Sequence, residues 1–243
     1  MTELLYQTDS YVREFQAAVV AVDGPGARVA LDRTAFYPGG GGQPCDTGSL
    51  QFGDVRAPVV KVGKEGDLVW HSLGSLPSGL SHLPAEGSEA SGFVDWERRY
   101  ALMRTHTALH ILCGVVWRDW GAQVTGGNMD PLAGRMDFEF ATMHADLVSQ
   151  IEARCNEEIA AERAVRVKIL PRAEAFQIPD LIRTKINLLP EGIQQVRTVE
   201  IVGLDLQADG GTHVANTREV SSIRVTDYKS KGAINKRIYI EVG

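Results

Sequence analysis

The first third of the chain is a succession of short apolar or alternating runs, which is typical of β-strands. Gly, Pro and Asp separate the runs at short intervals, and such spacing predicts a small barrel or sandwich. The predicted strands are FQAAVVAVD, ARVALDRTAFYP, GSLQFGD, VRAPVVKVGKEGDLVWHSL and SGFVDW. The stretch from Ser75 to Ser91 is rich in Pro, Gly and Ser and predicts a long surface loop. We therefore expect residues 1–94 to form a small β-barrel domain.

The pattern changes to a helical period at residues 96–120, where Leu102, Leu109, Leu112 and Val116 fall mostly on one side. A second helix is expected at 145–163. Strands are expected at 133–143, 165–172, 196–207, 222–230 and 236–243, and short helices or turns at AEAFQI and PDLIRTKI. This mixed order predicts an α+β domain with a mixed or antiparallel sheet over residues 95–243, so the whole chain is assigned to the α+β class.

The composition is that of an ordinary globular protein, with 243 residues, 44% of them hydrophobic and 23% charged. No apolar run is long enough to predict a transmembrane helix, and no signal peptide is expected. Three scattered cysteines, Cys45, Cys113 and Cys155, argue against a disulfide framework and for a reducing cytoplasm. No membrane association is expected. Nothing resembles a coiled coil, and a monomer is favoured.

A net charge of -6 makes the chain a poor candidate for non-specific nucleic-acid binding. Basic residues nevertheless gather in two places. The stretch from Ser221 to the end contains five, and Arg98, Arg99 and Arg104 cluster around the start of the first helix. Each of these residues alone is explained by an exposed position on the surface. Together, a local basic patch on an otherwise acidic protein can bind one specific nucleic acid.

Two histidines, His106 and His110, lie four residues apart in the predicted helix, and His213 lies much later in the run DGGTHV. Residues four apart share one helix face, so both imidazoles can converge on one ion. The pair alone is a weak signal, and it lacks the glutamate of the HExxH zinc peptidases. Asp209 and His213 are again four apart, and Gly210 and Gly211 between them allow a tight turn that points both side chains to one place.

Four segments in this order resemble the alanyl-tRNA editing family, the freestanding relatives of the editing domain of alanyl-tRNA synthetase. The segment DLQADGGTHVANTREV resembles its signature, and MRTHTALHIL resembles its first metal motif. AFYPGGGGQPCDTGSL resembles the glycine-rich motif of the longer members with an N-terminal barrel, and KSKGAINKRIYIEV resembles the basic strand that closes the editing domain.

The resemblance implies a metal site made of His106, His110 and His213, with Asp209 as the fourth ligand. The family's usual residue at that fourth position is cysteine, and a carboxylate is a harder ligand than a thiolate. Three histidines and an aspartate still suit one Zn²⁺ ion with room for water, and another divalent transition metal remains an alternative. Cys113, three residues after His110, is an alternative ligand, although a small buried hydrophobic residue is the plainer interpretation.

The resemblance also implies hydrolysis of the ester that joins a wrong amino acid, serine or possibly glycine, to alanine tRNA. The metal would anchor the aminoacyl end, activate water, or both. The side chains expected to be catalytic are Gln43, Thr125 and Asp209. Thr125 is the candidate for reading the serine hydroxyl, with Thr212 competing for that task. The alternative for Gln43 is a turn residue on the barrel surface, and for Thr125 a plain strand threonine.

The expected partner is the acceptor end of alanine tRNA. ATP would be a ligand only by analogy to ligase relatives and is not expected. The residues expected to contact substrate or tRNA are Gly40, Gly41, Gly42, Arg104, Gly210, Gly211, Thr212, Lys231, Lys236 and Arg237. The alternatives are a tRNA-binding module with weakened catalysis, which the aspartate favours, and a metal-dependent hydrolase of another small ester.

Overall fold

The computed structural model describes residues 1–25, 27–75, 83–182 and 192–243. The chain divides into two compact units. Unit 1 comprises residues 1–40 and 44–100, and unit 2 comprises residues 41–43 and 101–243. The division thus runs through the first long helix. The assignment of residues 1–94 and 95–243 as functional domains stays a prediction.

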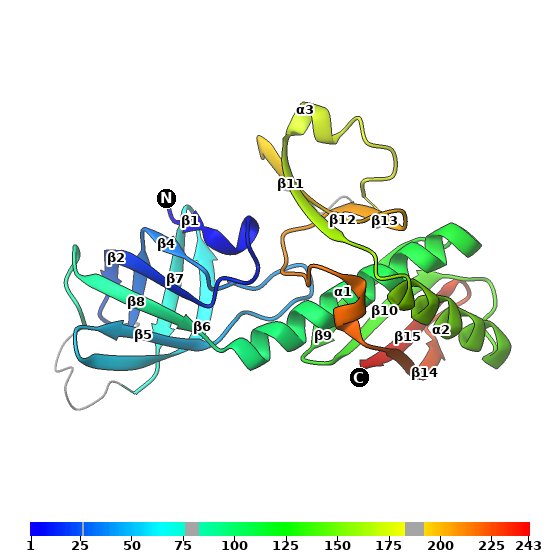
Figure 1. Ribbon diagram of the computed structural model, residues 1–243, viewed down its shortest axis with the longest axis horizontal. Helices are drawn as coiled ribbons and strands as arrows, with labels where there is room; N and C mark the ends of the chain where they lie inside the picture. Colours follow the sequence, from blue (N-terminus) through cyan, green and yellow to red (C-terminus); the bar gives the residue numbers. More distant parts are fainter. Residues whose placement is uncertain (26, 76–82, 183–191) are drawn as a thin grey trace. The chain divides into compact units, whose positions relative to one another are not determined.

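Unit 1 is a closed barrel in which the strands follow the order β2-β3-β7-β6-β5-β8 (Figure 1). Every pairing around the barrel is antiparallel. The strands are β2 (Glu14–Asp23), β3 (Arg28–Leu31), β5 (Gly48–Phe52), β6 (Val55–Glu65), β7 (Leu68–Leu73) and β8 (Glu89–Val94). A short parallel pair, β1 (Glu3–Leu4) with β4 (Arg33–Thr34), and the 3₁₀ turn η1 (Leu5–Gln7) complete the unit. The predicted small barrel is confirmed.

The barrel closes around a core of aliphatic and aromatic side chains, with Val29, Leu31, Phe36 and Leu50 fully buried. Arg99 is also fully buried, and its guanidinium is bound to the Asp46 carboxylate and donates to the carbonyls of Ser10 and Ala35. A buried charge is tolerated only when it is paired and hydrogen-bonded in this way. This ion pair joins the start of α1 (Trp96–Trp120) to the chain that follows the glycine-rich run.

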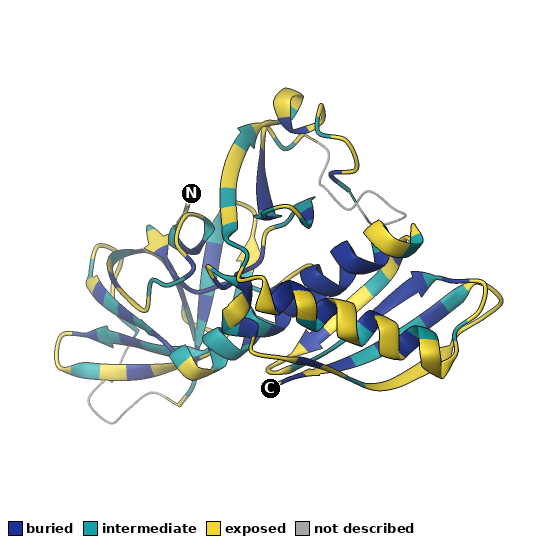
Figure 2. Ribbon diagram, turned by 45° about the vertical axis from the view of Figure 1, so that its right-hand side comes forward, coloured by how far each residue is buried: buried dark blue, intermediate teal, exposed yellow. Residues whose placement is uncertain are grey.

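Unit 2 contains a four-stranded antiparallel sheet in the order β14-β15-β10-β9. These strands are β9 (Val124–Asp130), β10 (Ala133–Glu139), β14 (Ile223–Ser230) and β15 (Asn235–Val242). Helix α1 packs on β10, where the Gly134 backbone lies directly against the Leu109 side chain. Helix α2 (Ala145–Ala160) packs beside β14, where the Asn156 amide bonds both the N–H and the carbonyl of Ile223. Figure 2 shows α1 largely buried, whereas α2 exposes one face.

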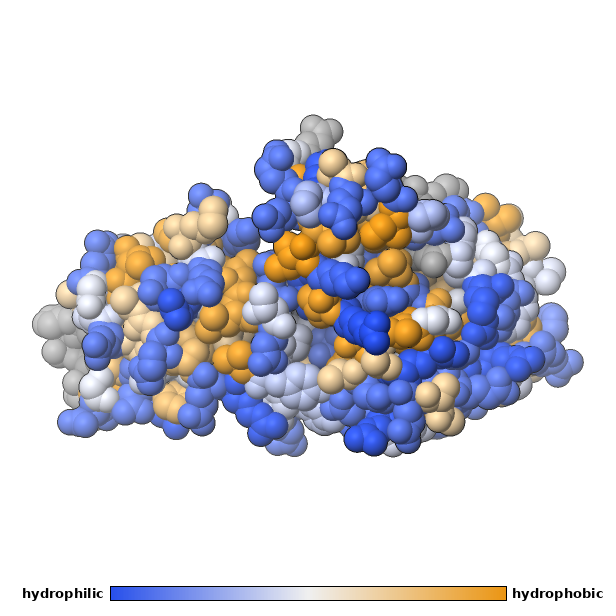
Figure 3. Space-filling view, turned by 45° about the horizontal axis from the view of Figure 1, so that its top comes forward, coloured by the Kyte–Doolittle hydropathy of each residue, from blue (hydrophilic) through white to orange (hydrophobic). Residues whose placement is uncertain are grey.

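A three-stranded antiparallel sheet, in the order β11-β12-β13, forms the rest of unit 2. Its elements are β11 (Val165–Pro171), α3 (Arg172–Ala175), β12 (Gln195–Ile201) and β13 (Asp205–Ala208), and the 3₁₀ turn η2 (Thr217–Val220) follows the site loop. The face drawn in Figure 3 is mostly hydrophilic, with hydrophobic groups scattered over several places, among them the part that carries α3. Ile169 and Phe176 are exposed in that part.

The α+β class is confirmed, and the first long helix is found at the predicted residues, 96–120. The prediction of one strand over 196–207 is wrong, because the chain turns after Ile201 and returns as β13. Gly203 has a φ of 77° at this turn, a conformation that glycine adopts without strain. Parts of the expected surface loop and of PDLIRTKI lie outside the described residues. Among the described residues, no helix is both long and apolar enough to cross a membrane.

His71 is buried inside the barrel, and its Nε2 lies 2.9 Å from the Thr34 hydroxyl. Burial lowers the pKa of His71 to about 4, and the Val29 carbonyl opposes this shift only partly. Because the folded state resists protonation, the associated stability is present above pH 6.5 and is lost as the pH falls towards 4. We expect the barrel to lose about 3 kcal/mol of unfolding free energy over this interval.

Hydrogen exchange of the β3 and β7 amides between pH 7 and 4 measures this loss, after correction for intrinsic exchange rates. The variant His71→Gln keeps a hydrogen-bonding side chain but cannot titrate in this range. Between pH 7 and 4 the variant should therefore lose about 3 kcal/mol less unfolding free energy than the wild type. Equal losses in the two proteins would show that His71 is not the group responsible.

Candidate metal centre

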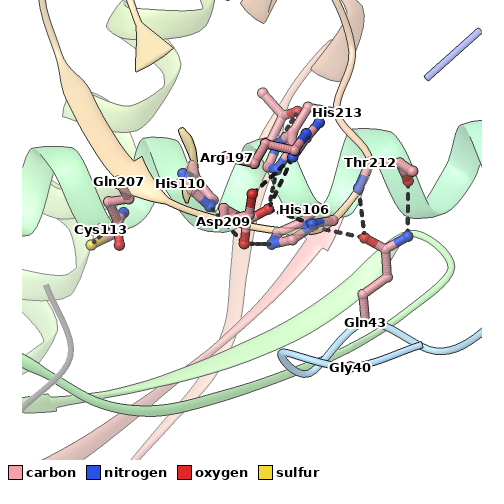
Figure 4. A network of polar contacts seen from close by, with 12 residues as sticks. Gly40, Gln43, His106, His110, Cys113, Arg197, Gln207, Asp209, Thr212 and His213 are labelled. Atoms are coloured by element: carbon pink, nitrogen blue, oxygen red, sulfur yellow. Dashed lines mark hydrogen bonds and ion pairs between the residues drawn. The ribbon is translucent and has the colours of Figure 1, made fainter. Parts of the chain in front are cut away.

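Two structural elements of unit 2 bring four potential ligands together (Figure 4). Helix α1 supplies His106 and His110 from one face, and the loop after β13 supplies Asp209 and His213. One ligand atom from each residue lies within 4.8 Å of those of the other three. The rings of His106 and His213 are 4.2 Å apart between centroids, and those of His110 and His213 are 4.7 Å apart. The juxtaposition predicted from the sequence is therefore present.

The three imidazoles direct the same nitrogen, Nε2, towards the Asp209 carboxylate. The Nε2 atoms of His106 and His110 lie 3.4 and 3.8 Å from Oδ2, and that of His213 lies 3.0 Å from Oδ1. Ligand atoms about 2.1 Å from a tetrahedral zinc ion are about 3.4 Å apart. The three distances to the two carboxylate oxygens lie around this value, and the four ligand atoms lie within 4.8 Å of one another, which is compatible with a single ion.

The opposite nitrogen of each ring, Nδ1, faces a polar partner in unit 2. Nδ1 of His106 lies 2.9 Å from Gln43 Oε1, and Nδ1 of His110 lies 3.0 Å from Asp205 Oδ2. Nδ1 of His213 lies 3.3 Å from the Thr107 hydroxyl. Metal-bound histidines almost always use their second nitrogen in this way, because the outer partner fixes the ring and its tautomer. The donor set and these partners fit a divalent metal ion.

Burial and charge at the cluster favour a cation. Burial lowers the pKa of His110, but hydrogen bonds and charge from Asp205 and Asp209 outweigh it and raise the value to about 9. Burial would raise the pKa of Asp209, yet the three histidines hold it well below its usual range. Burial, together with the charge of His106, lowers the pKa of His213 well below its usual range. The carboxylates of Asp205 and Asp209 thus favour positive charge at this point.

The site loop is held by its own backbone and by Arg197. Asp209 Oδ1 accepts from the Gly211 N–H at 2.7 Å. Arg197, which is buried on β12, donates to the Asp209 carbonyl at 2.9 Å, and its Nη1 lies 3.9 Å from Oδ1. A Cβ on Gly211 would lie 2.3 Å from Cε1 of His106 and 2.6 Å from Gln43 Oε1. Only glycine therefore allows the loop to lie this close to the first histidine.

Several predicted site residues lie at or beside the cluster. Gln43 and Thr212 are buried there and share a 2.8 Å hydrogen bond from Gln43 Nε2 to the Thr212 hydroxyl. The Gly42 carbonyl accepts from the Met129 N–H, which anchors segment 41–43 to β9. Gly210 is exposed beside Gly211 in the loop. Cys113, the alternative ligand, lies outside the group of four and accepts a 3.4 Å contact from Gln207.

The remaining predicted residues have other surroundings. Thr125 is exposed on β9 and donates to the Asn235 side chain. Arg104 donates to the carbonyls of Glu219 and Val220, and the buried Lys236 ammonium donates to those of Gly232 and Ala233. Arg237 pairs with Asp137, Lys231 is exposed after β14, and the Gly40 carbonyl accepts from the Tyr37 hydroxyl in unit 1. Their roles with substrate and tRNA stay predictions.

The sequence analysis missed Asp205, Thr107 and Arg197. A signal was present for Asp205, because an acidic residue in the apolar run IVGLDL needs a partner when buried. Thr107 directly follows the first histidine but resembles any helix threonine. Arg197 gave no signal, because its contact with Asp209 depends on the pairing of β12 with β13.

Two family models match parts of the chain. The model "Threonyl and Alanyl tRNA synthetase second additional domain" matches residues 196–239, and "tRNA synthetases class II (A)" matches residues 6–98. Both models describe domains of tRNA synthetases, so two separate parts of the chain are similar to parts of these enzymes.

Full-length similarity identifies the family. Alanyl-tRNA editing protein AlaX-M of Saccharolobus solfataricus is 39% identical and covers 100% of this chain and 99% of its own. The protein of the same name from Methanosarcina acetivorans is 37% identical over 98% of both chains. Alanine–tRNA ligase of Pyrobaculum neutrophilum is 37% identical over 92% of this chain but only 25% of the ligase. The chain belongs to the alanyl-tRNA editing protein family, whose members are deacylases, that is hydrolases, of mischarged tRNA.

The Asp205→Ala variant tests whether His110 offers Nε2 to a metal. Loss of the outer carboxylate should weaken Zn²⁺ binding about 10- to 100-fold, because the imidazole loses its fixed tautomer and orientation. Competition with a chromophoric chelator measures the affinity. The matched control is Asp227→Ala, which removes an exposed carboxylate from β14. Unchanged affinity in Asp205→Ala, with the fold intact by circular dichroism, would contradict the arrangement.

Proposed function

We propose that this protein hydrolyses the ester between a wrong amino acid and alanine tRNA, with serine as the main substrate and glycine as the second. One observation supports this most directly. In a chain of the editing family, three imidazole nitrogens and a carboxylate oxygen meet at ion-binding distances. Zn²⁺ is the proposed ion. When bound, it would serve as a Lewis acid towards the ester carbonyl or the attacking water.

The need for such an enzyme follows from the limited selectivity of the site at which a synthetase attaches alanine to its tRNA. A pocket built for the alanine methyl group rejects an analogue that adds a hydroxyl by only roughly a hundredfold. A second pocket that hydrogen-bonds the hydroxyl accepts serine, whereas alanine would leave buried polar groups unpaired there. This asymmetry is what makes a separate deacylase effective.

Thr212 and Thr125 are the candidates for reading the serine hydroxyl. Thr212 is fully buried beside the histidines, and its hydroxyl accepts from Gln43 and retains a proton to donate. Thr125 is exposed and already donates to Asn235. These surroundings favour Thr212. For tRNA, Lys231 is the exposed basic residue among the proposed contacts, with Arg104, Lys236, Arg237 and glycines 40–42 and 210–211 as the others. The proposed location of this activity is the cytoplasm, and the proposed state is a monomer.

The variant His106→Ala removes a ligand and should lower the deacylation of serine-charged alanine tRNA about a thousandfold, because a bound metal contributes several kcal/mol. Single-turnover release of serine measures this rate. The control is His144→Asn, which replaces an exposed histidine at the start of α2 by another good N-cap residue. Retention of full rate by His106→Ala after metal is stripped would remove the metal from the reaction.

Zinc content and serine release, measured in the wild type and in a variant of the proposed fourth ligand, distinguish an enzyme from a tRNA-binding module that has lost catalysis. Asp209→Cys restores the usual residue of the family and should retain or raise zinc content, since thiolate is a strong zinc ligand. Zinc per chain is measured by atomic absorption, and serine release by single turnover. Zinc binding and tRNA binding without any serine release in the wild type would favour the module.

A further inference from the structure

Gln43 lies at the end of the glycine-rich run, yet its side chain is buried against the metal cluster in unit 2. Three hydrogen bonds hold its amide. Oε1 accepts from the Thr212 N–H at 3.1 Å and lies 2.9 Å from Nδ1 of His106. Nε2 donates to the Thr212 hydroxyl at 2.8 Å.

The backbone of Thr212 fixes which way this amide points. A main-chain N–H can only donate, so the atom facing it must be the amide oxygen. The same oxygen faces Nδ1 of His106, and an amide oxygen can only accept a hydrogen bond. Nδ1 must therefore carry the proton, which leaves the lone pair of the ring on Nε2.

That lone pair is the one directed towards Asp209 and the other histidines, with Nε2 3.4 Å from Asp209 Oδ2. We infer that Gln43 is a positioning residue of the metal centre, which holds His106 in the tautomer and orientation that ligate the metal. It acts through His106 and not by contact with substrate. The inference rests on the proposed metal site, but it replaces the catalytic role expected for Gln43 from the sequence.

Gly211 gives independent support for a tight fit at this contact. A Cβ there would lie 2.4 Å from Nδ1 of His106 and 2.6 Å from Oε1 of Gln43, the two atoms that share the hydrogen bond. The loop backbone thus closes over this bond and leaves no space for even a methyl group. Segment 41–43 and the loop that carries Gly211 therefore meet beside Nδ1 of His106.

The test compares Gln43→Met, which removes the amide but keeps the length, with Gln43→Glu, which keeps an acceptor for His106. Chelator competition measures Zn²⁺ affinity, and the visible absorption of the Co²⁺-substituted protein reports ligand geometry. Gln43→Met should bind Zn²⁺ about 10- to 100-fold more weakly with an altered Co²⁺ spectrum. Gln43→Glu should stay within about threefold of the wild type, since a carboxylate is also an accepted outer partner. Gln51→Met, which changes a half-buried glutamine on the barrel strand β5, is the matched control.

Kinetics on serine-charged alanine tRNA at saturating Zn²⁺ separate positioning from substrate contact. A positioning role predicts that Gln43→Met keeps the wild-type KM and recovers much of its kcat. Wild-type Zn²⁺ affinity together with a raised KM would overturn the inference. Equal Zn²⁺ losses in Gln43→Met and Gln43→Glu would overturn it as well, because the acceptor would not matter.

If Gln43→Met does not fold, nitrogen-15 NMR of the zinc-loaded wild type decides the question. The inference requires the proton of His106 on Nδ1, and a proton on Nε2 would overturn it. Both the affinity and the tautomer are measured without any substrate. A chain that binds Zn²⁺ in this way but releases no serine would therefore refute the proposed function while leaving the role of Gln43 in place.

Discussion

The structure of unit 2 depends on a largely buried carboxylate that is surrounded by imidazoles. The Asp209 side chain is only 16% exposed and lies within 4 Å of Nε2 in all three histidines. Removing a carboxylate from water is costly unless positive charge compensates it. Positive charge near this carboxylate, from a bound cation or from a protonated imidazole, supplies that compensation. The outer contacts of Gln43, Asp205 and Thr107 are consequences of that requirement, because each holds one ring in the orientation that a cation needs.

The chain meets this requirement by combining one rigid element with one close-fitting loop. Helix α1 fixes the spacing of His106 and His110 through its period, and its packing on β10 fixes the face they occupy. The loop after β13 is placed by the pairing of β12 with β13 and by Arg197, which bonds the Asp209 carbonyl. The segment 41–43 then completes the outer side of His106. Three regions that are distant in sequence thus determine the geometry of one ligand.

Much of this could be predicted because it is encoded in local patterns. The 3.6-residue period of 96–120 predicted α1 and placed two histidines on one face, and the strand pattern predicted the barrel. The break between β12 and β13 was not predicted, because IVGLDL is mostly apolar and Gly203 is the main local mark of the turn. β9 carries Gly126 and Gly127, which weaken any strand signal, and it was not among the predicted strands.

Apart from the ligand set that the motif resemblance implied, contacts between distant segments could not be predicted. Gln43 and Thr212 are separated by 169 positions, and nothing local indicates that their side chains meet. The same holds for Lys236, whose basic character suggested an exposed role although its ammonium is enclosed by the carbonyls of its own hairpin. The resemblance of motifs supplied the ligand set, whereas the partners of each ligand depend on tertiary packing.

The residue at the proposed fourth ligand position, Asp209, also bears on how the centre would respond to oxidants. In the family pattern that the loop resembles, this position holds a thiolate, which peroxide converts to sulfenic acid and then to forms that cannot be reduced back. A carboxylate has no sulfur to attack. Cys113 and Cys155 are buried, and neither contributes to the cluster. The proposed ligand set therefore contains no thiol, and if it holds the metal, peroxide has no sulfur to oxidise at this centre.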